Sequence, residues 1–270
     1  MKRSRRRSAR MNAMHFRVLT ARYFRQIFTN LGTVLPLLLE APVLLLLFIV
    51  ACKADAFTEK NVTDANTAIF LLVVMSALMG ILNSYREICK EREILSREVF
   101  GGLDVTAYAL SKFVVLAAFG AGQCLVLYCG AALYTDFAFA EPFAAYPLCW
   151  LALYLVNLST TAIGLFLSAF LKRSESAILP VLLIIIVCVV FSDCVLTMDG
   201  AAGYLRYITP TAWGAGVFGS YTGLNGWREG FSRELYDSPP LLSLAVLAAI
   251  TLLFLSAAIA CLRHAYKSKE

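Results

Sequence analysis

Six continuous apolar runs, each about twenty residues or longer, dominate this sequence of 270 residues. An α-helix rises about 1.5 Å per residue, so about twenty residues cross the roughly 30 Å hydrocarbon core of a bilayer. A transmembrane β-barrel would instead show alternating segments of about ten residues. We therefore predict an all-α integral membrane protein. Its six transmembrane helices are expected at about residues 31–52, 67–85, 107–134, 144–171, 177–197 and 241–262.

The composition excludes an ordinary soluble enzyme. Apolar residues make up 60% of the chain and charged residues 16%. Soluble domains are about half apolar and about a quarter charged. The eight cysteines contain no C-x-x-C pair, and seven of them fall in or beside the predicted spans, where buried thiols behave as small apolar groups.

The basic residues fall mainly on one side of the predicted spans. Of the 24 Lys and Arg residues, nine precede residue 31, five lie between Arg86 and Lys112, two are at 172–173 and three follow residue 262. The positive-inside rule then places both termini in the cytoplasm of a multi-pass protein of the cell membrane. Attraction between the basic residues and anionic lipid headgroups accounts for the net charge of +6, so no nucleic-acid partner is expected.

Two amphipathic segments accompany the first spans on the predicted cytoplasmic side. The sequence predicts a basic cytoplasmic tail at residues 1–12 and a single transmembrane domain at residues 13–270. Within residues 13–29 the apolar side chains share one helical face, which predicts a helix lying in the membrane interface. The residues on this face are Phe16, Leu19, Tyr23 and Ile27.

The loop between the second and third spans is the most charged part of the chain. Residues 85–98 alternate both signs of charge, and Gly101-Gly102 follows them. This pattern predicts a loop helix that ends at the two glycines. Fixed charges of both signs suit the recognition of a soluble partner. A narrow apolar stripe is formed by Tyr85, Ile88, Leu95 and Val99.

The segment between the last two predicted spans, residues 198–240, is apolar enough to dip back into the outer leaflet. Irregular backbone at such a depth must be shielded by protein. Pro210 and the glycines Gly214, Gly216 and Gly219 are expected to break this re-entrant segment into short pieces.

Motifs for catalysis are missing from the sequence. No lysine follows a glycine, so a phosphate-binding G-x-x-x-x-G-K-[ST] loop is absent. The two histidines do not form H-E-x-x-H, and we expect no catalytic residue, no metal site and no cofactor on this chain. Glu40 lies inside the first span, where a carboxyl group is costly. It either meets a polar neighbour at a helix interface or lines a cavity as a proton-linked group.

The order of several motifs resembles the permease half of G-subfamily ABC exporters. Residues 85–92, then Arg97-Glu98, Gly101-Gly102 and residues 108–112, resemble the coupling-helix region of that family. Other matching stretches are residues 158–169, which resemble its fourth span, 191–193, which stand where the family has Phe-Ser-Gly, and 204–210, which resemble its external re-entrant segment.

The resemblance implies a homodimer or a close heterodimer, in which a separate ATPase subunit holds ATP and Mg²⁺. It also implies roles for particular residues. The ATPase-coupling set would be Glu87, Lys90, Glu91, Arg92 and Arg97. Met75 stands near the position of a substrate-clamping phenylalanine, and Cys194 and Val195 align with an apolar pair at the cavity exit; with Glu40 they are the candidates for the cavity or gate.

The function expected from the residues and the resemblance together is that of a permease subunit. It would export a hydrophobic or amphipathic compound, in contact with membrane lipid, and would not be an enzyme itself. Two alternatives remain open at this stage. One is an ion-coupled secondary transporter that uses Glu40, and the other is a membrane-embedded protein that processes lipid.

Overall fold

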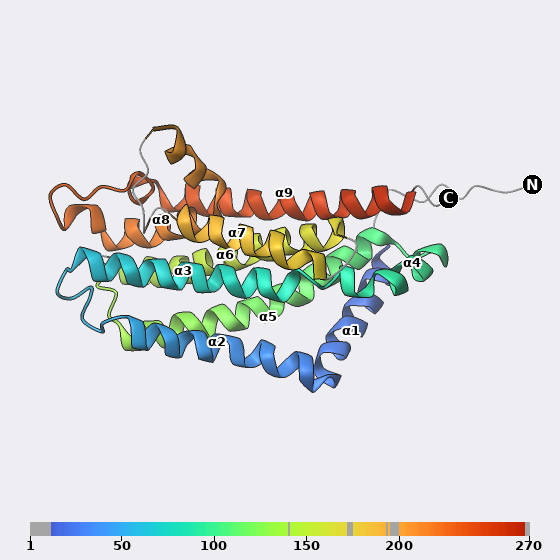
Figure 1. Ribbon diagram of the computed structural model, residues 1–270. Coiled ribbons are helices and arrows are strands. Elements are labelled where there is room, and N and C mark those ends of the chain that lie inside the picture. The colour runs from blue at the N-terminus through green and yellow to red at the C-terminus, as the bar shows by residue number, and fades with distance from the viewer. Residues whose placement is uncertain (1–11, 140, 172–174, 193, 195–199, 268–270) are drawn as a thin grey trace, which may run out of the picture.

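A computed structural model describes residues 12–139, 141–171, 175–192, 194 and 200–267. The described residues form helices and their connections (Figure 1). Five helices are long and apolar enough to cross a membrane, namely α2, α3, α5, α6 and α9. The predicted class of all-α integral membrane protein is confirmed. The helices are α1 (Ala13–Thr29), α2 (Leu31–Ala51), α3 (Val62–Ser84), α4 (Arg92–Phe100), α5 (Val105–Tyr134), α6 (Pro142–Phe170), α7 (Ile178–Val190), α8 (Pro210–Thr222) and α9 (Pro240–Lys267).

Short polar residues set where these helices begin. The side chains of Asn12, Asn30 and Asn61 accept hydrogen bonds from backbone N–H groups in the first turns of α1, α2 and α3, and Asp104 does so for α5. Such N-caps satisfy donors that have no partner inside the helix. The cap at Asn61 explains why α3 begins at Val62, five residues before the predicted start at 67.

The fifth predicted span is shorter than expected. Residues 177–197 were predicted to cross the membrane, whereas α7 has 13 residues and therefore measures about 20 Å. The hydroxyl of Thr211 donates to the carbonyl of Cys188 (2.6 Å), and the hydroxyl of Thr209 donates to that of Phe191 (2.8 Å). The last carbonyls of α7 thus find partners at the start of α8, which allows the helix to end inside the protein.

The predicted re-entrant segment contains a longer helix than the sequence suggested. Helix α8 runs unbroken from Pro210 to Thr222, with Pro210 in its first turn, where proline costs no hydrogen bond. Its glycines allow close packing instead of breaking the helix. A Cβ atom added at Gly219 would lie 2.2 Å from the ring of Tyr236, and one at Gly214 would lie 2.5 Å from Val156.

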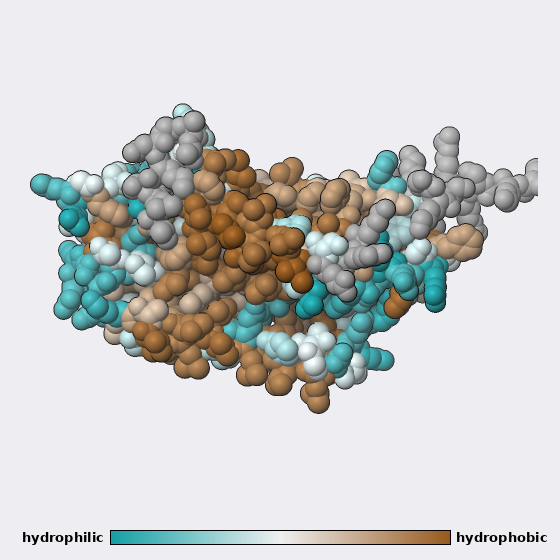
Figure 2. Space-filling model, viewed as in Figure 1, coloured by the Kyte–Doolittle hydropathy of each residue, from teal (hydrophilic) through white to brown (hydrophobic). Residues whose placement is uncertain are grey.

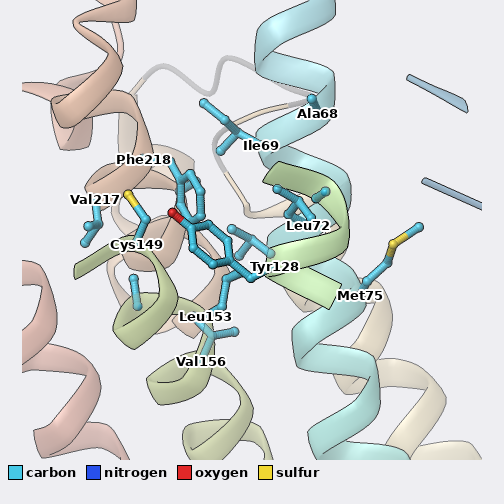
Figure 3. Packing of buried hydrophobic residues seen from close by; sticks show 14 of the residues in the cluster. Ala68, Ile69, Leu72, Met75, Tyr128, Cys149, Leu153, Val156, Val217 and Phe218 are labelled. Atoms are coloured by element: carbon cyan, nitrogen blue, oxygen red, sulfur yellow. The ribbon is translucent and has the colours of Figure 1, made fainter. Parts of the chain in front are cut away.

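Helix α6 lies at the centre of the bundle and packs most extensively against α3 and α9. Helix α2 lies at the edge, against α5, and exposes Leu35, Leu38 and Leu39. The surface along this edge is largely hydrophobic (Figure 2). The buried apolar side chains form two clusters. The first cluster surrounds Tyr128 of α5 and includes Ile69, Leu153 and Phe218 (Figure 3). The ring centroid of Tyr128 lies 6.1 Å from that of Phe218. The second cluster lies at the end of the bundle where α1, α4 and the C-terminal part of α9 meet (Figure 1).

The apolar face of α1 has a different partner from the one predicted. Leu19, Tyr23 and Ile27 are buried within the protein, where α1 packs against α5, so they do not face lipid. The exposed apolar side chains of α1 include Phe24 and Phe28. This packing fixes α1 to the bundle at the end that also carries α4.

Candidate functional site

A buried cluster of charged groups lies where α1, α5 and the chain just before α4 meet. The side chain of Lys112, in α5, is only 2% exposed. Its Nζ lies 2.8 Å from Glu91 Oε2 and 3.5 Å from Glu87 Oε2. The same ammonium lies 3.9 Å from the centroid of the Tyr23 ring. A buried ammonium needs such compensation, because the loss of hydration on burial costs several kcal/mol.

Neutral side chains complete the cluster. The hydroxyl of Tyr23 donates to Glu87, and that of Tyr108 donates to Glu91 Oε2 (3.0 Å). Gln26 donates to the other carboxylate oxygen of Glu91 (3.1 Å). Burial, and next the charge of Glu87, raise the pKa of Tyr23 well above its ordinary value, so its hydroxyl stays protonated and remains a donor. Charge-assisted hydrogen bonds therefore fasten α1 to residues 87–91 and to α5.

The chain around the start of α4 is also fastened to the end of α6. Ser168 Oγ accepts hydrogen bonds from the backbone N–H groups of Ile88 (2.9 Å) and Cys89 (3.0 Å). Arg92 Nη1 donates to the carbonyl of Leu171 at 2.6 Å, which supplies a partner for the C-terminus of α6. These contacts hold residues 85–100 in one position on the bundle.

An ion pair joins α4 directly to α1. Arg22 forms a two-pronged pair with Glu98, at 2.5 and 3.1 Å. We call α1, residues 85–100 and the first two turns of α5 the end block. Buried or paired charged groups link the parts of the end block to one another.

The five residues that the resemblance assigns to ATPase coupling differ in exposure. The side chains of Glu87 and Glu91 are only 12% and 13% exposed. Arg92 is half-buried against α6. Lys90 and Arg97 are exposed. The other exposed side chains of residues 85–100 are Arg86, Glu93, Ile94 and Phe100, and Phe100 is 91% exposed.

Sequence reasoning did not identify Lys112 as part of this site. One signal was available, because Lys112 is the single charged residue of the predicted span 107–134. An ionisable residue in a span points to a buried partner.

A cavity of about 510 Å³ lies between α1, α2 and the end of α3. Glu40, predicted either to meet a polar neighbour or to line a cavity, does both. Its Oε2 accepts hydrogen bonds from Asn83 Nδ2 (2.8 Å) and Gln123 Nε2 (3.0 Å), which come from α3 and α5. Gln123 Nε2 also donates to the carbonyl of Leu37 (2.7 Å). The network ties three helices together beside the cavity.

The helical bundle with its end block agrees with a comparison against protein families. The family model described as ABC-2 type transporter matches residues 14–220, which is most of the chain. The chain belongs to the ABC-2 type transporter family. Comparison with curated protein sequences gave no match. An ABC-2 domain is the membrane component of an ABC transporter, so the chain is a multi-pass permease component.

Two of the predicted gate residues lie in the interior of this ABC-2 chain. Met75, one of the candidates for the cavity or gate, is 6% exposed and packs in the first cluster, on the side of α3 turned away from Tyr128 (Figure 3). Cys194 is buried as well, and its carbonyl accepts a hydrogen bond from Asn66 (2.7 Å). Val195 lies outside the described residues. Of the three candidates that the structure describes, Glu40 is the one on the wall of the 510 Å³ cavity.

Proposed function

We propose that this chain is the permease subunit of an ATP-driven exporter of a hydrophobic or amphipathic compound. It would lie in the cell membrane with both termini in the cytoplasm. A separate ATPase subunit would hold ATP and Mg²⁺ and would dock on the end block, and a second copy of the chain or a related permease would complete the transporter. The observation that carries this proposal is the end block itself, in which an exposed loop helix is fastened to α1, α5 and α6.

The exposed side of α4 has the features of a docking surface. Phe100 and Ile94 are apolar anchors on a short helix, with exposed fractions of 91% and 57%, and the charged Arg97 lies between them in sequence. Buried aromatic anchors contribute most of the energy of many interfaces, whereas surrounding charges set register and partner choice.

When the ATPase closes, the resulting displacement of α4 would be transmitted to the spans through the buried cluster. A push on α4 passes to α1 through Arg22 and Glu98. It passes to α5 through Glu87, Glu91 and Lys112. Since these links are short and charged, the end block transmits a rigid-body displacement, and the spans respond by changing access across the membrane. Glu87 and Glu91 are positioning residues in this proposal, behind the contact surface.

A double substitution on α4 tests the proposed docking surface. Replacing Arg97 by Glu and Phe100 by Ala reverses one charge and removes one anchor. We expect the Mg²⁺-ATPase activity that co-purifies with the tagged chain in mild detergent to fall at least about tenfold, because loss of one hot-spot residue typically costs about 2 kcal/mol. The matched control is Arg228→Glu with Phe143→Ala, two exposed residues far from the end block in sequence.

Equal ATPase activity with both double variants would show that the partner does not dock on α4. If the wild-type chain brings down no ATPase at all, the exporter proposal fails as a whole. Transport that continues without ATP but stops in Glu40→Gln would then support an ion-coupled carrier.

A further inference from the structure

Two charged groups at the 510 Å³ cavity have no counter-charge among the described residues. Four charged side chains line it. Glu87 and Lys90 form an ion pair with each other. Glu40, by contrast, accepts hydrogen bonds only from neutral amides, and the partner of Arg86 is the ring of Tyr85, at 5.0 Å from its guanidinium carbon. The cavity therefore presents one carboxyl group and one guanidinium group that have no ion-pair partner among the described residues.

The two groups lie at different depths. Asn83 contacts Glu40, and Arg86 follows Asn83 by three residues, which is about one helical turn, or roughly 5 Å, nearer the end block. Glu40 is nine residues into α2, so it lies about 14 Å along that helix from its start. A ligand that satisfies both groups carries its positive charge deep in the cavity and its negative charge near the end block.

Apolar side chains form another part of the wall. Pro36, Leu37, Leu82 and Leu116 line the cavity, and the neighbouring outward face of α2 exposes further leucines. Figure 2 shows hydrophilic side chains interrupting the hydrophobic surface between α2 and α3. The volume lies within the range of roughly 300–1,000 Å³ that small-molecule sites have. The site thus combines a cavity that carries a carboxyl and a guanidinium group with a border of apolar side chains.

We propose that this cavity binds the headgroup of a zwitterionic phospholipid that carries a primary ammonium. The ammonium donates to Glu40, the phosphate pairs with Arg86, and the acyl chains lie along the exposed leucines of α2. An anionic lipid would leave Glu40 uncompensated, and a cationic amphiphile would leave Arg86 uncompensated. A quaternary ammonium has no N–H group to donate to the carboxylate, so it binds less tightly. This inference goes beyond the proposed function, because binding needs neither ATP nor a partner.

The test measures lipid retention by the purified chain in a non-ionic detergent, using native mass spectrometry. The probes are lysophosphatidylethanolamine, lysophosphatidylcholine and lysophosphatidylglycerol at equal concentration. We expect the wild-type chain to retain the ethanolamine probe about tenfold more than either of the others, as a charge-assisted hydrogen bond would give. Soluble phosphoethanolamine, which lacks acyl chains, should compete poorly. Competition as strong as that of the lyso-lipid would identify a soluble ligand and overturn the lipid assignment.

Single substitutions test the roles of Glu40 and Arg86 one at a time. Glu40→Gln should remove the preference for ethanolamine over choline, and it keeps an oxygen that accepts from Asn83 and Gln123. Arg86→Gln should weaken all three phosphate probes about equally, and Arg86→Lys should restore them. The matched controls are Glu59→Gln and Arg228→Gln, which neutralise exposed charges outside the cavity and should leave retention unchanged.

An unchanged ratio of ethanolamine to choline in Glu40→Gln would overturn the proposal, as would equal retention of the three probes by the wild type. Melting temperature provides a second readout. If Glu40→Gln and Arg86→Gln each lower it, the double variant lowers it no further and retention is unaffected, the two side chains pair with each other and the cavity holds no headgroup.

Discussion

Replacing Lys112 by alanine should lower the free energy of unfolding by about 3–5 kcal/mol, because removing one partner of a buried ion cluster leaves a buried carboxylate without its cation. Glu87 and Glu91, whose side chains are 12% and 13% exposed, would both lose the ammonium that lies between them. Glu87 would keep its ion pair with Lys90, whereas the remaining donors to Glu91, Tyr108 and Gln26, are neutral. The effect is measured as a fall in the melting temperature of the purified chain in detergent.

Two variants control this prediction. Lys53→Ala removes an ammonium that pairs with Asp64 at 2.9 Å but is 68% exposed, so it should cost less than about 1 kcal/mol. Combining Lys112→Met with Glu87→Gln and Glu91→Gln removes all three charges together and should recover most of the loss. A melting temperature that is unchanged in Lys112→Ala, or unrecovered in the triple variant, would mean that the end block does not depend on this cluster.

The helices of this chain could be predicted from the sequence because their signals are local. Continuous apolar runs fixed the class, and the boundaries of α1 and α2 follow from Asn12 and Asn30, which cap those helices. Where the physical cause was not local, prediction failed. The end of α7 depends on hydroxyls supplied by Thr209 and Thr211, which are about twenty residues away in the chain.

The interior of the end block could not be predicted for the same reason. Alternating charges are typical of a solvated helix face, so Glu87 and Glu91 were expected on the surface. Their partners come from other elements, since Tyr23 lies 64 residues before Glu87. Likewise, Arg92 reaches a carbonyl 79 residues further along the chain. Charge pattern shows which side chains need partners, but only the fold brings those partners together.

The polar groups at the cavity could be predicted only in part from the sequence. Glu40, Asn83 and Gln123 are polar residues inside the predicted spans 31–52, 67–85 and 107–134, where polar side chains need hydrogen-bond partners. Nothing in the sequence indicated that they would meet one another, because α2, α3 and α5 could pack in more than one order. The charge of Glu40 could therefore be anticipated from the sequence, whereas its position on a cavity wall could not.

Gly80→Ala should lower the free energy of unfolding by about 3 kcal/mol, almost as much as Lys112→Ala. Helix α3 passes so close to α6 at this point that an added Cβ atom would lie 2.3 Å from the carbonyl oxygen of Asn157 and 2.2 Å from Thr160 Oγ1. A backbone oxygen cannot rotate away, so the two helices must separate. This cost falls at the upper end of the range for overpacking. Separation would also stretch the bond from Thr161 Oγ1 to the carbonyl of Gly80, now 3.3 Å.

The matched control for this substitution is Gly122→Ala in α5, where an added Cβ atom meets nothing within 4 Å. Its melting temperature should stay the same or rise slightly, because alanine favours a helix over glycine. Adding Thr160→Ala to Gly80→Ala separates the two clashes, since it removes the hydroxyl and leaves the carbonyl of Asn157 in place. Only part of the lost stability should return. Full recovery would show that a flexible side chain, and not the backbone of α6, limits how closely α3 and α6 approach.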